Sequence, residues 1–103
     1  MNPVVGKYRS STGIIDSILR SVGSGNTRTQ IMYRAYLSYT QLKGYLRTCL
    51  ERGLLTFDME QDIFNMISRG LQFMSAFAEI KKVLPTEEEE NEARRLTILR
   101  QSG

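Results

Sequence analysis

Residues 27–71 read TRTQIMYRAYLSYTQLKGYLRTCLERGLLTFDMEQDIFNMISRGL, and this stretch decides the fold. It contains two helix-start signals that lie eleven residues apart. Thr27 is followed after three residues by Gln30, and Ser38 is followed in the same way by Gln41. In this arrangement, a capping box, the hydroxyl and the amide side chain bind backbone N–H groups that the first helical turn leaves free. The spacing therefore predicts one short helix, a tight turn and a second helix.

The second of these helices is expected to cover residues 39–52. It ends there because Gly53 follows, and glycine readily adopts the left-handed conformation that commonly terminates a helix. Two β-prone segments come next, residues 54–59 and 63–67, separated by the polar residues 60–62. Such a pair of segments predicts a short hairpin. The order of helix, turn, helix and hairpin is typical of a winged helix-turn-helix.

A further helix is expected upstream of this unit. Apolar side chains recur there at helical spacing, at Ile14, Ile15, Ile18, Leu19 and Val22. Asp16 and Arg20 form an i,i+4 pair on the other side of this helix. Its start can be capped by Ser10, Ser11 or Thr12.

A last helix is expected over residues 69–84, with Ser68 as its cap and Pro85 as its stop. The predicted fold is therefore mainly α with a small β-hairpin, a winged helix-turn-helix with a C-terminal dimerisation helix. The expected divisions are a flexible N-terminus at 1–9, the winged helix-turn-helix at 10–67, the C-terminal helix at 68–84, and an acidic then basic tail at 85–103.

Charge is unevenly distributed along the chain. Residues 1–56 carry eight basic and two acidic side chains, whereas residues 57–103 carry six basic and nine acidic ones. The basic half contains the helix-turn-helix pattern, which favours a polyanionic partner over ordinary solvated charge. The hairpin, in contrast, carries Asp58, Glu60 and Asp62. Because acids repel phosphates, this wing is expected to stand away from DNA or to contact protein.

Composition argues against several functional classes. With Cys49 as its single cysteine and no histidine, the chain cannot build the usual zinc sites, and an enzyme is not expected. No cofactor, small-molecule substrate or ligand-sensing pocket is evident. No apolar run approaches the roughly 20 residues that span a membrane, and the N-terminus lacks a signal core. A lone thiol fits a reducing cytoplasm, where a DNA-binding chain would be nucleoid-associated.

The predicted second helix has two chemically different sides. At about 100° per residue, its core side carries Leu42, Tyr45, Leu46 and Cys49. Its outward side carries Thr40, Lys43, Gly44, Arg47 and Glu51. Lysine and arginine can donate to guanine or to phosphate, and threonine offers a hydroxyl or a methyl group. The residues expected to bind DNA are Arg28, Ser38, Tyr39, Thr40, Lys43, Gly44 and Arg47.

Several of these assignments leave alternatives open. Gly44 costs about 1 kcal/mol relative to alanine at an exposed helix position. Close approach to DNA, packing on another part of the protein and simple tolerance all account for it. Arg28 can hold a phosphate, and further candidates for contacts to the DNA backbone are Lys7, Arg9 and Arg34. Three tyrosines near the turn are expected to pack, with hydroxyls toward polar partners or phosphates: Tyr33, Tyr36 and Tyr39.

Residues 28–55 resemble the small archaeal winged-helix DNA-binding proteins described as predicted transcriptional regulators, a group that includes dimeric chromatin-associated proteins of Sulfolobus. The resemblance is carried by residues 29–35, 37–39, 42, 45–46 and 50–55. It extends to residues 64–71, where Ile67 replaces the threonine of the family, so that the cap is expected to move to Ser68. The match covers about residues 10–84. It implies duplex DNA binding, no cofactor, and dimerisation through the last helix as an antiparallel coiled coil.

The last helix carries two apolar stripes. Phe73, Phe77, Ile80 and Leu84 follow a heptad spacing. A second stripe beside it contains Leu71, Met74 and Ala78. Two apolar faces suggest that one serves the domain and the other a partner, which predicts a homodimer with the heptad stripe at its interface. A single wide core face is the alternative.

The leading functional hypothesis is a duplex-DNA-binding transcriptional regulator that acts as a homodimer, with the helix at about 39–52 in the major groove. The alternatives are an architectural chromatin protein with mainly phosphate-driven binding and a winged-helix module that contacts protein. The five glutamates within residues 87–92 are expected to be solvated, to continue a helix, or to compete with DNA for the basic face. The operator and the direction of regulation do not follow from the sequence.

Overall fold

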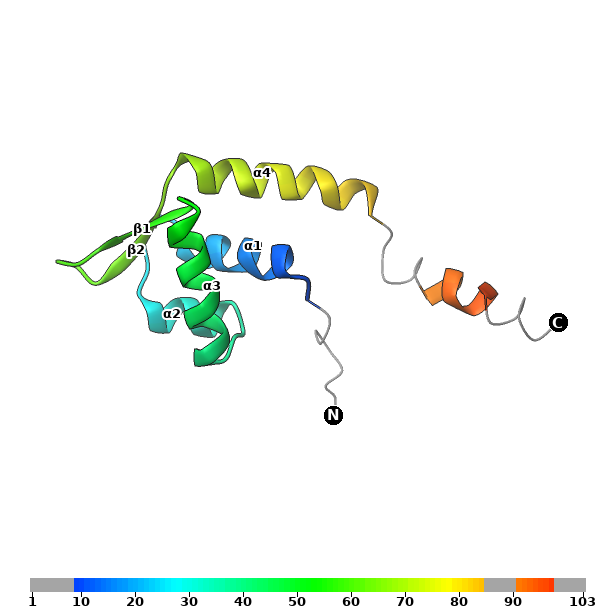
Figure 1. The fold of residues 1–103 in the computed structure, drawn as a ribbon, viewed down its shortest axis with the longest axis horizontal. Coiled ribbons are helices and arrows are strands. Elements are labelled where there is room, and N and C mark those ends of the chain that lie inside the picture. Colours follow the sequence, from blue (N-terminus) through cyan, green and yellow to red (C-terminus); the bar gives the residue numbers. More distant parts are fainter. Residues whose placement is uncertain (1–8, 85–90, 98–103) are drawn as a thin grey trace.

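The computed structural model describes residues 9–84 and 91–97. In chain order the labelled elements, shown in Figure 1, are α1 (Ser11–Val22), α2 (Arg28–Arg34), α3 (Tyr39–Glu51), β1 (Leu55–Asp58), β2 (Ile63–Met66) and α4 (Ser68–Val83). Residues 91–97 are also helical. These elements confirm the predicted mainly α fold with a small β-hairpin. The expectations for residues 1–8, including Lys7, and for the glutamates at 87–90 lie outside the described residues.

Hydroxyl caps set the starts of the first three helices. Ser10 Oγ accepts a hydrogen bond from the backbone N–H three residues later, at 3.0 Å, so it is the cap of α1. Thr27 Oγ1 accepts one from the Gln30 N–H at 3.2 Å. Ser38 and Gln41 form a complete capping box, in which the Gln41 side chain also accepts the Ser38 N–H at 3.1 Å. Both helix starts predicted inside the motif are therefore confirmed. The box predicted at Thr27 is incomplete, however, because Asn26 Oδ1 accepts the Thr27 N–H in place of the Gln30 side chain.

The start of α4 differs from the prediction. Ile67 occupies the N-cap position, and no side chain caps the first turn. The predicted cap at Ser68 is wrong because β2 runs to Met66, which leaves a single residue between strand and helix and places Ser68 inside the first turn. The turn is closed by backbone bonds instead, from the Gly70 and Leu71 N–H groups to the Ile67 carbonyl at 2.8 and 3.2 Å.

The end of α3 is fixed by a turn in which Gly53 has a φ of 73°. The Gly53 N–H donates to the Leu50 carbonyl at 3.2 Å, and the Leu54 N–H donates to the Cys49 carbonyl at 2.8 Å. This is the paired pattern of a Schellman motif, which satisfies the last carbonyls of a helix. The motif confirms the predicted end of this helix and turns the chain directly into the hairpin.

One apolar core holds α1, α2, α3 and the hairpin together. Its largest fully buried side chains are Phe64, Ile18, Leu19, Ile31, Leu42, Leu55, Val22 and Cys49. Cys49 is thus a core residue, as its place on the apolar side of α3 predicted, and burial raises the pKa of its thiol to about 11. Within the described residues, no helix is long and apolar enough to cross a bilayer.

The hairpin pairs β1 with β2 in antiparallel register, from Leu55 opposite Met66 to Asp58 opposite Ile63. A third segment joins this sheet, which the sequence did not indicate. The Asn26 N–H donates to the Phe64 carbonyl at 3.1 Å, and the Phe64 N–H donates to the Asn26 carbonyl at 2.7 Å. The loop that precedes α2 is therefore bonded to the second strand of the wing.

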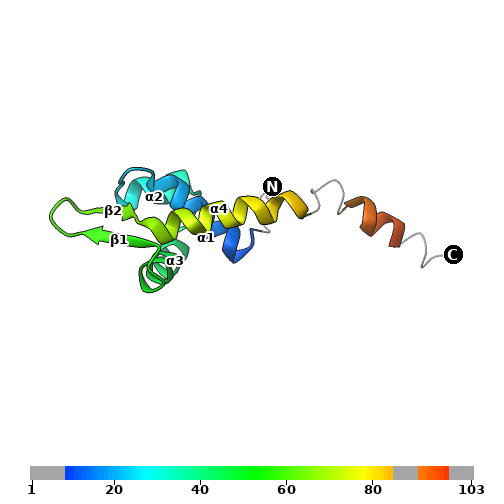
Figure 2. The same ribbon diagram turned by 90° about the horizontal axis from the view of Figure 1, so that it is seen from above.

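α4 packs along α1, and its C-terminal end extends beyond the helix-turn-helix body (Figures 1 and 2). The close approach at its first turn depends on Gly70, which is buried. A Cβ at this position would lie 2.5 Å from the Leu54 carbonyl oxygen and 2.7 Å from Met66 Cγ. The absence of a side chain thus lets α4 rest on the turn that ends α3 and on the hairpin.

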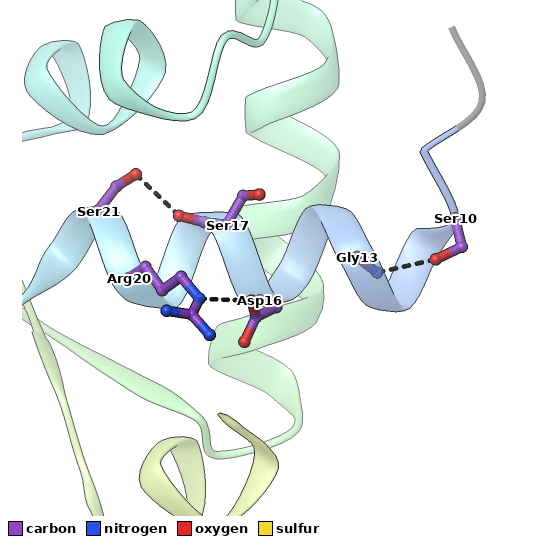
Figure 3. Close-up of polar contacts among 6 residues, drawn as sticks. All are labelled: Ser10, Gly13, Asp16, Ser17, Arg20 and Ser21. Carbon is purple, nitrogen blue, oxygen red and sulfur yellow. Dashed lines mark hydrogen bonds and ion pairs between the residues drawn. The ribbon is translucent and has the colours of Figure 1, made fainter. Parts of the chain in front are cut away.

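Asp16 is buried, whereas the sequence placed it on the side of α1 away from the core. The pairing itself is present, because Arg20 Nε lies 2.6 Å from Asp16 Oδ2 (Figure 3). Its burial follows from the surroundings of α1, which contacts α2, α3, β2 and α4 and leaves little of its surface to solvent. Asp16 Oδ1 has no hydrogen-bond partner among the described residues.

Candidate nucleic-acid interface

All seven residues predicted to bind DNA are exposed. They are Arg28, Ser38, Tyr39, Thr40, Lys43, Gly44 and Arg47. The orientation of α3 explains this for the residues on that helix, because its opposite side is buried in the core through Leu42, Leu46 and Cys49. The polar side of α3 is therefore free along the length of the helix.

Three of the predicted cations are brought together. Arg28, Lys43 and Arg47 line one hollow of about 350 Å³, which we call the basic hollow. Its remaining lining residues are Leu46, Leu50, Glu51 and Phe64. Three cations and one acid at a single depression give a positive potential on this face, which suits a phosphate or a base edge that accepts hydrogen bonds.

The wing helps to position Arg28. Its guanidinium carbon lies 5.6 Å from the centroid of the Phe64 ring, within the range of a cation–π contact. Phe64 is the strand residue that bonds to Asn26, and Asn26 Oδ1 accepts the Thr27 N–H at 2.9 Å. A short bonded path thus leads from the wing to the start of α2. Sequence periodicity gave no sign of these roles for Asn26 and Phe64, because both depend on contacts distant in the chain.

Gly44 faces open space. A Cβ built on it would meet nothing within 4 Å. Packing against another part of this protein, one of the three explanations for this glycine, is therefore excluded among the described residues. Close approach to a partner and simple tolerance remain.

Ser38 has a structural role at this face. Its hydroxyl accepts the Gln41 N–H as part of the capping box, so its oxygen is engaged in starting α3. Tyr39 and Thr40 follow in the first turn of the helix, and both are exposed. The first turn therefore offers side chains to the outside while its backbone is held by the cap.

The three tyrosines near the turn do not pack, contrary to expectation. Tyr33, Tyr36 and Tyr39 are 69%, 87% and 55% exposed. Tyr36 takes the left-handed position that ends α2, with a φ of 56°, and it therefore points out of the turn. The Leu37 N–H donates to the Met32 carbonyl at 3.1 Å, the bond that a glycine-terminated helix usually makes. The apolar side chains buried at this turn are those of Ala35 and Leu37 instead.

Arg9 is occupied at the same turn. One of its guanidinium nitrogens donates to the Ala35 carbonyl at 2.8 Å and to the Tyr36 carbonyl at 3.4 Å. A cation at this position satisfies carbonyls that the end of α2 leaves free and opposes the negative end of the helix dipole. The structure thus gives Arg9 a stabilising role within the fold. Arg34, the other described candidate for backbone contact, is exposed.

The tip of the wing is acidic, as the sequence indicated. Asp58 Oδ1 accepts the N–H groups of Glu60 and Gln61 at 2.9 and 3.2 Å, which closes the turn. Glu60 and Asp62 are exposed. The hairpin extends away from the helices (Figure 1), and its three acidic residues do not line the basic hollow.

The four residues predicted for the dimer seam fall into two groups, two that pack on their own domain and two that are exposed. Phe73 packs against the core, and a Cβ on Gly13 of α1 would lie 3.9 Å from Phe77 Cζ, so both rings lie on the side of their own domain. Ile80 and Leu84 are 51% and 53% exposed. Val83, which the heptad stripe omits, is 82% exposed. Among the described residues, exposed apolar side chains of this segment therefore occur at its C-terminal end and also in the first turn of α4, where Leu71 is 58% exposed.

A metal centre finds no support in the described part of the chain. Within residues 9–84 and 91–97, no three cysteine or acidic side chains gather where they could hold a metal ion.

Comparison with known proteins agrees with this architecture. A family model described as winged helix-turn-helix matches residues 8–84. The structure is similar to that of Sso10a-2, a DNA-binding protein from Sulfolobus solfataricus, with a TM-score of 0.70, 21% sequence identity, and 90% of this chain and 96% of that chain covered. No curated protein sequence matches the chain.

Two bacterial structures share the fold more loosely. The multiple antibiotic-resistance repressor of Listeria monocytogenes gives a TM-score of 0.53 at 15% identity, with 91% of this chain and 77% of that chain covered. ZitR of Lactococcus lactis in complex with DNA gives a TM-score of 0.51 at 13% sequence identity, with 99% of this chain and 81% of that chain covered. At such identities the likeness is one of fold.

Proposed function

Because the chain belongs to the winged helix-turn-helix family, we propose that it binds duplex DNA as a homodimeric transcriptional regulator, with α3 in the major groove. The observation that carries this proposal is the basic hollow, where Arg28, Lys43 and Arg47 meet beside the polar side of α3. The Sulfolobus protein of similar fold is itself described as DNA-binding, and ZitR is seen with DNA, which adds support.

The proposed contacts follow from the chemistry of the side chains. Arg47 and Lys43 lie along the exposed side of α3 and would donate to guanine acceptors or to phosphates. Arg28, at the start of α2, would hold a phosphate of the adjacent backbone, as such contacts fix the orientation of a protein on the duplex. Gly44 lies next to Lys43 with open space above it, so the backbone of α3 could approach the floor of the groove closely there.

The proposed dimer is supported by the exposed apolar end of α4. Ile80, Val83 and Leu84 are exposed, and they belong to the C-terminal end of this helix segment, which in Figure 2 extends beyond its own domain. Apolar side chains at such spacing favour a helix–helix contact with a second copy. The heptad residues Phe73 and Phe77 would then border the seam, with one side of each ring against its own domain.

A salt titration of duplex binding tests the proposal. Each phosphate that the protein neutralises contributes about −0.9 to the slope of log K against log salt concentration. We expect tight binding at low salt, with a slope that corresponds to several phosphate contacts. Binding that is undetectable at low salt would contradict a DNA-binding function.

The same titration separates the two DNA-binding roles. A regulator binds one duplex, such as the region upstream of its own gene, more tightly than random duplex, typically by a factor of about 10³ or more. Equal affinity for both would instead support an architectural protein of the nucleoid, because phosphate-driven binding carries no sequence preference.

A further inference from the structure

A second hollow lies on the other side of α3, between this helix, α1 and the first turns of α4. It measures about 370 Å³ and is lined by Ile15, Thr48, Arg52, Leu54, Arg69 and Phe73. It shares no lining residue with the basic hollow. We call it the arginine hollow. The proposed DNA contacts make no use of it.

The arginine hollow combines an apolar lining with few polar groups. Leu54 belongs to the buried core, and Ile15 and Phe73 are half-buried against it. Concave sites of about 300–1,000 Å³ with a mainly apolar lining and a small number of convergent polar groups are typical of small-molecule binding. The size and lining of this hollow meet that description at its lower end, which suits a ligand no larger than a fused ring system.

The polar groups of the hollow are two guanidinium groups and one hydroxyl. Arg52 and Arg69 take part in no ion pair among the described residues. Two like charges that line one depression raise its positive potential, and a guanidinium matches the two oxygens of a carboxylate with parallel hydrogen bonds. A complementary ligand would therefore carry an anionic group, which pairs with the arginines, and an apolar part, which contacts the apolar lining.

The local fold holds these groups in place. The turn at Gly53 sets Arg52 at the end of α3 and Leu54 at the floor of the hollow. Arg69 Cδ lies 3.7 Å from where a Cβ of Gly53 would be, so its aliphatic part rests on the same turn. The uncapped start of α4 lies one residue before Arg69, and the positive end of its dipole adds to the potential.

We propose that the arginine hollow binds a small aromatic or alicyclic carboxylate. The ring covers Ile15, Leu54 and Phe73, and the carboxylate lies between Arg52 and Arg69. Such a ligand contacts α3 through Arg52 and α4 through Arg69, and so joins the helix proposed to read DNA to the helix proposed to dimerise. The binding itself does not depend on either of those proposals.

Titration of the full chain with 2-naphthoate, followed by NMR shifts of backbone amides and by calorimetry, tests the site. We expect saturable binding with shifts centred on residues 52–54 and 69–73, weakened about tenfold or more for the uncharged 2-naphthamide, since about 1.4 kcal/mol corresponds to a factor of ten. The double variant Arg52→Gln/Arg69→Gln should weaken naphthoate binding by a similar factor. Both arginines are exposed, so the variant is expected to fold, which thermal unfolding verifies.

The matched control is Arg34→Gln, which removes an exposed arginine outside the hollow and should leave naphthoate affinity unchanged. Three results would overturn the proposal: no saturable binding of naphthoate, equal binding of naphthoate and naphthamide, or equal binding by the wild type and the double variant. If naphthoate fails to bind while the double variant loses affinity for duplex, the two arginines contact DNA phosphates, and the proposal of a carboxylate site is refuted.

Discussion

The guanidinium of Arg28 lies over the ring of Phe64, with its carbon 5.6 Å from the ring centroid. Arg28 is exposed at the start of α2, whereas Phe64 is 1% exposed in the second strand of the wing. Arg28 is the surface cation that we propose binds phosphate. The contact with Phe64 thus connects its side chain to the hydrophobic core. Such contacts are worth about 0.5–1 kcal/mol at exposed sites, and they reduce the number of positions that a long side chain occupies.

A double-mutant cycle measures what this contact contributes to DNA binding. We expect Phe64→Leu to weaken duplex binding by about 0.5–1 kcal/mol when Arg28 is present, because the guanidinium loses its ring. In the Arg28→Ala background the same substitution should have no further effect on affinity. Fluorescence anisotropy at a temperature where all four proteins are folded gives the coupling energy. A coupling of zero would show that the ring does not position Arg28 for DNA.

Gly44→Ala is expected to stabilise the fold and to weaken DNA binding. Alanine in place of glycine in an exposed helix interior adds about 1 kcal/mol to the free energy of unfolding, and a Cβ at Gly44 meets nothing within 4 Å. If the backbone of α3 approaches DNA at this point, the same methyl group obstructs the contact. Urea unfolding and duplex binding are measured on the same sample. Greater stability with unchanged affinity would assign Gly44 to simple tolerance.

Gly70→Ala is the contrasting substitution, with the opposite effect on stability. Its Cβ would lie 2.5 Å from the Leu54 carbonyl oxygen and 2.7 Å from Met66 Cγ, so α4 must shift away from the hairpin. We expect a loss of about 1–3 kcal/mol in the free energy of unfolding, the usual cost of overpacking. A stability equal to that of the wild type would contradict the close approach of α4.

Ile80→Glu/Leu84→Glu is expected to convert the proposed dimer to a folded monomer. Both side chains are half-exposed in the single chain, so the domain tolerates charge there, whereas a dimer seam would bury it at a cost of several kcal/mol. Sedimentation equilibrium gives the mass, and circular dichroism verifies the fold. Lys81→Glu/Lys82→Glu, on exposed polar positions of the same turns, is the charge control. A wild-type chain that is monomeric at micromolar concentrations would refute the dimer.

The thiol of Cys49 is expected to make the fold less stable in alkali. Burial raises its pKa from 9.0 to about 11, so between these pH values the folded chain binds more protons than the unfolded chain. The protonated thiol contributes about 2–3 kcal/mol to the free energy of unfolding. This contribution is fully present below pH 9 and is lost as the pH rises through about 11. The free energy of unfolding should therefore decline less steeply in Cys49→Ala over this range. If the free energy of unfolding declines equally in the wild type and in Cys49→Ala, the raised pKa of Cys49 is not the cause of the alkaline loss.

Local signals in the sequence predicted the helices well. The hydroxyl cap at Thr27, the capping box at Ser38 and the turn at Gly53 each depend on residues within a few positions of one another, and each is present. The box expected at Thr27 is only half formed, because the Thr27 N–H donates to Asn26 Oδ1 and not to Gln30. The apolar and polar sides of α3 followed from its period alone. For the same reason the exposed positions of Lys43 and Arg47 could be predicted before their convergence with Arg28 was visible.

Features that depend on distant contacts were not predictable in this way. Asp16 is buried because α1 is covered by elements from across the chain, and Asn26 joins the sheet by pairing with a strand that follows much later. Tyr36 was expected to pack as an aromatic residue, but the end of α2 requires a left-handed position that turns it outward. The arginine hollow combines residues from α1, α3, α4 and the turn after α3, and no motif in the sequence indicates it.

We propose that α3 binds duplex DNA mainly through Lys43 and Arg47. The most direct test is the affinity of the variant Lys43→Ala/Arg47→Ala for duplex across a range of salt concentrations, with Lys82→Ala as the control cation on α4. We expect the double variant to lose about 1–3 kcal/mol of binding free energy for a base contact, or to show a salt slope smaller by about one unit for each lost phosphate contact. Lys82→Ala should change neither quantity. A folded double variant that binds every duplex with the affinity and salt slope of the wild type would contradict this proposal.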